Sequence, residues 1–212
     1  MTTAAAFLDH LAPGDRRFAR ARGYICPLDP VLEPVPRGAT HLDIGCGRGL
    51  LIAAAMTARG TRSAGVEVSA AAIGRATALL GRVAGALGTA PPDLRVAATA
   101  AEWPAGPFQA VTLVDVLHHV PPPVQEEFLR AAAARVAPGG VLVFKDMAMR
   151  PAWKRMMNTL HDLASARELV NYVPLERVVA VLGAAGLDLA ETRRYGVLWY
   201  AHELAVFRRR AA

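Results

Sequence analysis

The sequence predicts an α/β fold of three layers, in which helices cover both faces of a mostly parallel, seven-stranded sheet. Two observations carry this prediction. An apolar strand at 40–45 runs directly into glycines at positions 45, 47 and 49, and a helix follows at once. Stretches typical of strands and of helices then alternate along the chain. Such alternation is typical of parallel sheets, because each strand is followed by a helix that returns the chain to the same end of the sheet.

The elements follow one another in a regular order. Strands are expected near 40–45, 63–68, 93–97, 109–115 and 140–145. Helices are expected at 49–59, 69–87, 122–136 and 175–185. Gly60 and Gly186 suit helix ends, and Ser69 suits a helix start. The first 37 residues contain frequent prolines, so only short helices are expected there.

The last third of the chain completes the sheet. Pro151 can begin a helix whose apolar side chains recur at i, i+3 and i+4 spacing, namely Trp153, Met156, Met157, Leu160 and Leu163. Two closing strands, 187–193 and 202–208, are expected to form an antiparallel hairpin at the sheet edge.

The glycine turn also predicts a ligand site. Gly45, Gly47 and Gly49 allow a backbone that a Cβ would obstruct, and main-chain N–H groups at the helix start face an incoming ligand. A dinucleotide fingerprint, G-x-G-x-x-G, would place its third glycine at position 50, where this chain has Leu50. The spacing therefore disfavours a nicotinamide cofactor.

Four landmarks in order resemble those of class I S-adenosylmethionine-dependent methyltransferases, and the likeness covers roughly 38–147. Asp43 to Gly49 reads D-x-G-C-G-x-G, like the family's first motif. Glu67 follows 24 residues after Asp43, at the end of the second strand. Residues 108–120 resemble the fourth strand with its double histidine, and 135–143 resemble the turn into the fifth strand. The resemblance implies that this is a small bacterial methyltransferase-domain protein. It also implies a Rossmann-like fold and S-adenosylmethionine as the cofactor.

The same resemblance implies roles for particular residues. The turn, with Gly45, Cys46, Gly47 and Gly49, would hold the methionine half of the cofactor, while Asp43 would act on its amino group or order the turn. The remaining cofactor contacts are expected from Glu67 and Val68 at the ribose, Thr99 and Ala100 at the adenine, and Asp115 near the sulfonium. The family usually has an aspartate where Thr99 stands, so a backbone carbonyl or Glu102 is expected to replace it.

An oxygen or nitrogen acceptor also needs a place for its proton, and histidine suits this task because its pKa lies near neutrality. His118, His161 and His202 are the candidates, each with a structural role as the alternative. His41 is expected to be structural. Lys145 and Asp146 would either contact substrate or pair with each other. No metal site is predicted from the cysteine and histidine spacing.

The whole chain, 1–212, is expected to form one methyltransferase domain. We expect a cap at 1–37, a cofactor-binding core at 38–147, a lid or substrate segment at 148–174, and a final helix and hairpin at 175–212. Met and aromatic side chains gather in the last third, which suits an apolar or aromatic acceptor.

Composition limits the partners. The formal net charge is +6, and only Lys145 and Lys154 are lysines, so we do not expect nucleic acid as substrate. Two cysteines and no signal peptide or membrane span predict a cytoplasmic location. The predicted function is methylation of a small acceptor, with oxygen favoured, in a lipid or polyketide-type pathway, with a carrier-bound acceptor as one refinement. An RNA methyltransferase, a nicotinamide oxidoreductase and a non-catalytic cofactor-binding module are the alternatives, and the oligomeric state stays open.

Overall fold

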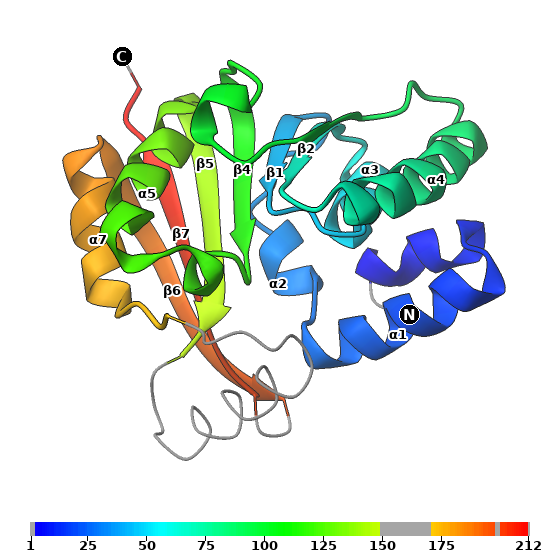
Figure 1. The fold of residues 1–212 in the computed structure, drawn as a ribbon, viewed down its shortest axis with the longest axis horizontal. Coiled ribbons are helices and arrows are strands. Elements are labelled where there is room, and N and C mark those ends of the chain that lie inside the picture. Colours follow the sequence, from blue (N-terminus) through cyan, green and yellow to red (C-terminus); the bar gives the residue numbers. More distant parts are fainter. Residues whose placement is uncertain (1–2, 149–170, 198–199, 212) are drawn as a thin grey trace.

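A computed structural model describes residues 3–148, 171–197 and 200–211 of the chain. Its centre is one seven-stranded sheet in the order β3-β2-β1-β4-β5-β7-β6, with helices on both faces (Figure 1). The strands are β1 Thr40–Ile44, β2 Arg62–Glu67, β3 Asp93–Val96, β4 Phe108–Val114, β5 Val136–Met147, β6 Leu187–Val197 and β7 Tyr200–Arg209. The first five strands pair in parallel, and β7 pairs antiparallel with both β5 and β6. The predicted fold class and the closing hairpin are therefore confirmed.

Helices connect these strands. They are η1 Thr3–His10, α1 Pro13–Ile25, α2 Asp29–Leu32, α3 Leu50–Arg59, α4 Ala70–Leu87, η2 Ala100–Glu102, η3 Leu117–His119, η4 Pro122–Val124, α5 Gln125–Ala134 and α7 Leu175–Ala184. Ser69 caps α4 by accepting a hydrogen bond from the Ala72 amide, and Gly60 ends α3 with a left-handed backbone. The helix expected from Pro151 falls outside the described residues.

The amino-terminal segment differs from the prediction of short helices only. Helix α1 has 13 residues. Pro13 stands in its first turn, where the missing N–H group leaves no hydrogen bond unmade, and the next proline is Pro27. The prolines of this region therefore bound a helix of ordinary length instead of interrupting it.

Alternating residues of the strands fill two apolar layers. On one face Ala110, Val141 and Val143 pack with the apolar side chains of α3 and α4. On the other face Leu42, Val111 and Leu113 pack with those of α5 and α7. The period of two along each strand explains why these strands are apolar on both faces, as expected for the centre of a parallel sheet.

Helix α4 is long and apolar enough to be a candidate for a membrane span by length and composition alone. Its side chains Leu79, Leu80 and Val83 are nonetheless buried in the layer against the sheet. Packing against the sheet therefore accounts for these large apolar side chains, although most of the helix is not buried.

Candidate active site

A cavity of about 790 Å³ opens at the carboxyl ends of β1, β2 and β4. This is the edge at which open α/β sheets bind their ligands. Its wall includes eight of the residues singled out from the sequence, namely Asp43, Gly45, Cys46, Gly47, Glu67, Val68, Ala100 and Asp115. The fold thus brings most of the predicted cofactor residues together around one space.

The glycine turn after β1 is fastened to the end of β2. The amides of Gly45 and Cys46 both donate hydrogen bonds to the Val66 carbonyl, at 2.8 and 3.0 Å. The amide of Gly49 closes the turn on the Cys46 carbonyl at 2.8 Å. These bonds leave the amide of Gly47 directed toward the side chain of Glu67.

The three glycines of the turn are needed for different reasons, although all three have a positive φ. A Cβ on Gly45 would lie 2.3 Å from a methyl group of Val116, and a Cβ on Gly49 would lie 2.7 Å from Leu80. A Cβ on Gly47 would meet no atom within 4 Å, because Gly47 faces the cavity. Gly45 and Gly49 therefore permit packing, whereas Gly47 keeps space open for a ligand.

Glu67 stands between the turn and the start of α4. Its Oε2 accepts a hydrogen bond from the Gly47 amide at 3.1 Å, and its Oε1 accepts one from the Ser69 amide at 3.1 Å. The carboxylate is thereby held at the cavity wall next to Val68, which is 68% exposed. This is the position expected for an acid that receives a ribose.

Asp43 lies deeper, at the end of β1, with 3% of its surface exposed. Its Oδ1 accepts a hydrogen bond from the Thr112 hydroxyl at 2.7 Å. Burial raises the pKa of Asp43 to about 7, and the hydrogen bond from Thr112 only partly opposes this rise. A carboxyl group with this pKa is only partly ionised near neutral pH.

Asp115 carries a second charged cluster at the end of β4. Its oxygens contact Lys145 Nζ at 2.6 Å and Arg22 Nη2 at 2.9 Å. Burial alone would raise the pKa of Asp115, but the two cations hold it well below its ordinary value. Lys145 is fully buried and contacts Cys26 Sγ at 3.2 Å. Lys145 and Asp146 therefore do not pair with each other, because their side chains lie on opposite faces of β5.

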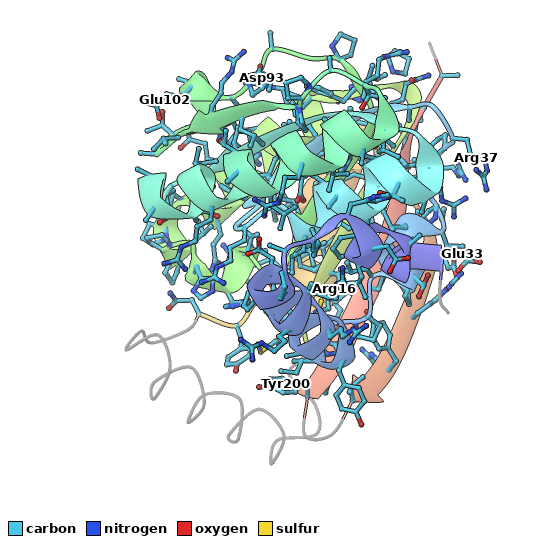
Figure 2. The ribbon with its side chains drawn as sticks, turned by 90° about the vertical axis from the view of Figure 1, so that its right-hand side faces the viewer. Arg16, Glu33, Arg37, Asp93, Glu102 and Tyr200 are labelled. Carbon is cyan, nitrogen blue, oxygen red and sulfur yellow. The ribbon has the colours of Figure 1, made fainter. Side chains whose placement is uncertain are left out.

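The loop after β3 does not present the groups expected for adenine. Glu102 turns its Oε2 back to the amides of Ala98 and Thr99, at 2.7 and 2.8 Å, and its pKa is lowered by these backbone hydrogen bonds. The structure places Thr99 in this capping arrangement and not in the cavity wall, which Ala98 and Ala100 form instead. In Figure 2, Glu102 lies at the opposite end of the molecule from Tyr200, which begins β7.

The candidate histidines occupy different environments. His118 is buried outside the cavity wall, and its Nδ1 lies 2.5 Å from Asp146 Oδ1, whereas the neighbouring His119 lines the cavity. His202 is also buried outside the wall; its Nε2 donates to the Ile25 carbonyl at 3.0 Å, and burial lowers its pKa to about 4. His161 falls outside the described residues.

Several cavity residues were not singled out from the sequence. Phe18 comes from α1, while Trp103 and Phe128 pack edge to face, with ring centroids 5.1 Å apart. Arg48 of the turn stacks on the Phe18 ring, 4.1 Å from its centroid. Arg48 lies within the glycine motif, but no local motif marks Phe18, Trp103 or Phe128, because segments far apart in the chain bring them to the same cavity.

Comparison with known proteins decides the family. The profile described as "Methyltransferase domain" matches residues 16–192. The chain belongs to this family. The resemblance to class I S-adenosylmethionine-dependent methyltransferases is therefore confirmed at the level of the family.

Similar proteins agree with this assignment. The chain is 36% identical over 113 residues to a ubiquinone biosynthesis O-methyltransferase of Chromobacterium violaceum, a match over 52% of this chain and 45% of that protein. It is 32% identical over 128 residues to the protein of the same name from Albidiferax ferrireducens, over 60% of this chain and 46% of that protein. The chain thus spans about half the length of the curated relatives it matches.

Solved structures share the fold. An O-methyltransferase family protein from Burkholderia thailandensis superposes with a TM-score of 0.71 at 18% identity, covering 96% of this chain and 62% of that one. The magnesium protoporphyrin IX methyltransferase of Synechocystis PCC 6803, solved with bound SAH, superposes with a TM-score of 0.69 at 19% identity, over 94% and 88% of the two chains.

Gly47 is the sharpest test of the cavity. We expect Gly47→Val to abolish binding of S-adenosylhomocysteine in calorimetry, because its side chain would enter the open space beside the turn. The positive φ of Gly47 adds a stability cost of roughly 1 kcal/mol, so the variant should remain folded. Gly49→Val is the matched comparison, since it should clash with Leu80 and lower the melting temperature strongly. Normal binding by a folded Gly47→Val protein would contradict the assignment of the turn.

Asp43 gives a prediction about stability and pH. A carboxyl group whose pKa rises from 3.8 to about 7 on folding destabilises the native state as pH increases through that range. Asp43→Asn removes this cost, so its gain in unfolding free energy should be roughly 2 kcal/mol larger at pH 8 than at pH 5. Urea unfolding at both pH values measures the difference. An equal gain at the two pH values would mean that Asp43 keeps an ordinary pKa.

Proposed function

We propose that the chain transfers the methyl group of S-adenosylmethionine to an oxygen atom of a small, apolar or aromatic acceptor. The proposed cofactor rests on one observation. Space is open beside the Cα of Gly47, and the Glu67 carboxylate is held next to it by the Gly47 amide. The preference for oxygen is supported by the relatives that are named O-methyltransferases. A lipid or polyketide-type pathway, a carrier-bound acceptor and a cytoplasmic location remain part of the proposal.

The residues present fit the cofactor. The turn at Gly45, Cys46 and Gly47 would receive the methionine half, with the ammonium group near Asp43. Glu67 would accept hydrogen bonds from the ribose hydroxyls, and Val68 and Ala100 would contact the adenine. When bound, the cofactor supplies a methyl group on a positively charged sulfur, already activated for displacement. The protein then has mainly to align and enclose the reacting groups.

The aromatic part of the cavity lining suits an apolar acceptor. Phe18, Trp103 and Phe128 supply aromatic surface, and Leu28 and Val124 extend it. The amino-terminal helix α1 lines the cavity through Phe18 and Arg22, and Cys26 follows directly after the helix, which supports a capping role for residues 1–37. The proposed lid at 148–174 rests on the sequence, because most of it falls outside the described residues.

The acceptor hydroxyl must lose a proton. We propose His118 as the group that receives it, although its ring is buried outside the cavity wall; the ring of the cavity residue His119 lies 4.1 Å away between centroids. Asp146 accepts a hydrogen bond from Nδ1 of His118 and also from the Met147 amide at 2.8 Å, so the carboxylate is itself fixed. A carboxylate on Nδ1 makes Nε2 the basic nitrogen of the ring. His202 is a weaker candidate, because burial keeps its pKa near 4. His161, which falls outside the described residues, stays a candidate base on the sequence alone.

Cofactor choice is tested first. We expect S-adenosylhomocysteine to bind with micromolar affinity in calorimetry and NADH to give no heat, because Leu50 stands where a dinucleotide turn needs glycine. Micromolar binding without turnover of any acceptor would favour a non-catalytic binding module. A panel of catechols, phenols, carboxylic acids and a short RNA, followed by release of S-adenosylhomocysteine, separates the acceptors. Turnover of the RNA alone would contradict the small-molecule proposal.

The base is tested with the acceptor that the panel identifies. His118→Ala should lower kcat by about 10²–10⁴-fold with little change in KM, because general-base assistance acts on the transition state. Asp146→Asn should lower kcat less and alter the pH profile, since the asparagine keeps a hydrogen bond but not the charge. His202→Ala is the comparison variant. If His118→Ala lowers only the melting temperature, the histidine is structural.

A further inference from the structure

A row of hydrogen-bonded side chains runs from Asp43 through the interior of one face of the sheet. His41 and Asp43 lie on the same face of β1, where Asp43 is paired in register with Thr112 of β4 and His41 with Ser63 of β2. The links are Asp43 Oδ1 to Thr112 Oγ1 at 2.7 Å, Thr112 Oγ1 to His41 Nε2 at 2.9 Å, His41 Nδ1 to Ser63 Oγ at 3.2 Å, and Ser63 Oγ to Thr61 Oγ1 at 2.9 Å. The row thus joins the cavity end of the sheet to the opposite end.

Its surroundings are apolar. His41 and Thr112 have no exposed surface, and the same layer contains Ala110 and the fully buried alanines of α3. Polar groups in such a layer cost free energy unless each one is paired, and an apolar side chain of similar shape would pack there without that requirement. If His41 and Thr112 act on the Asp43 carboxylate, that action explains why these two buried positions are polar.

The hydrogen bonds of the row can be oriented in two ways, depending on whether Asp43 is ionised or protonated. With Asp43 ionised, Thr112 donates to the carboxylate, His41 donates from Nε2 to Thr112, and Ser63 donates to Nδ1 of His41. With Asp43 protonated, its carboxyl group donates to Thr112, Thr112 donates to Nε2, and the ring donates from Nδ1 to Ser63. The two states differ by one proton. A proton accepted at the Thr61 end and passed along each existing bond converts the first state into the second.

We propose that Thr112 and His41 are positioning residues for cofactor binding: they hold the Asp43 carboxylate toward the turn and carry its proton to the far end of the sheet. The proposal rests on the proposed function, in which Asp43 faces the ammonium group of the cofactor. A cofactor bound in the cavity would cover Asp43 from that side, because Asp43 lines the cavity. The row then gives the carboxyl proton an exit through Ser63, which is only partly buried.

The other groups around Asp43 do not replace the row. Glu67 is a like charge that favours the protonated form of Asp43, and burial raises the pKa of the Cys46 thiol, which keeps it neutral. Helix α3 covers this face and carries no charged residue before Arg59. Among the described residues, the Thr112 hydroxyl is the side-chain group that donates a hydrogen bond to the Asp43 carboxylate. His41 itself stays neutral above about pH 5, because burial lowers its pKa to about 4.

Thr112→Val tests the first link, because valine has the same shape without the hydroxyl group. Calorimetry with S-adenosylhomocysteine between pH 5.5 and 8.5 should show weaker binding by the wild type below about pH 7. In Thr112→Val we expect about tenfold weaker binding at pH 7 and a fall that begins about one pH unit higher. Thr112→Ser keeps the hydroxyl group and should retain the wild-type pH profile. If Thr112 serves only in packing, both variants should keep the wild-type pH dependence of binding.

The tautomer of His41 tests the second link in the unaltered protein. Nitrogen NMR of ¹⁵N-histidine protein distinguishes Nε2–H from Nδ1–H, and His41→Gln identifies the signal. We expect mainly Nδ1–H at pH 5.5 without ligand and Nε2–H once S-adenosylhomocysteine is bound. The same tautomer under both conditions would contradict the relay.

The outcomes separate the two proposals. If the wild-type protein does not bind S-adenosylhomocysteine, the proposed function fails and the relay fails with it. If the wild type binds normally, while Thr112→Val keeps the wild-type pH profile and the His41 tautomer does not change, only the relay is wrong. Should Thr112→Val fail to fold, the tautomer measurement and Thr112→Ser still decide between these results.

Discussion

The site depends on one connection, in which the turn after β1 is fastened to the end of β2. Two successive amides, of Gly45 and Cys46, share the Val66 carbonyl, and the next amide meets the Glu67 carboxylate. A backbone that satisfies three donors in this way must bend sharply, and the positive φ values at Gly45 and Gly47 are the consequence. The bend directs the Gly47 amide at the Glu67 carboxylate and so sets the distance between the turn and the acid that would bind the ribose.

A cluster of charges joins three segments of the chain near this centre. Asp115 contacts Lys145 of β5 and Arg22 of α1, so one carboxylate connects the end of β4 with β5 and α1. Removing Asp115 would leave the fully buried Lys145 without a carboxylate partner, which is costly in a poorly solvated interior. Asp115 also has a positive φ of 56°, an uncommon value for a residue other than glycine.

Two parts of the cavity lining come from the chain in different ways. The turn and Glu67 belong to one short continuous motif and to the end of the next strand. The aromatic side chains of the lining come from separate segments, namely Phe18 from α1, Trp103 from the loop after β3 and Phe128 from α5. Such an arrangement would let the aromatic lining vary without disturbing the turn. It fits a family whose folds agree closely while their sequence identities remain low, as the solved structures illustrate.

The sequence alone determined the fold class, the positions of the strands and the turn, because these follow from local patterns: apolar periodicity, glycine spacing and helix caps. Gly47 and Glu67 could be assigned for the same reason. Only the tertiary structure decided which polar side chains meet. Lys145 pairs with Asp115 instead of Asp146, Glu102 binds its own loop, and His41 joins Asp43 through Thr112. These contacts depend on strand order and register across the sheet, which bring together residues as much as 71 positions apart that no local spacing connects.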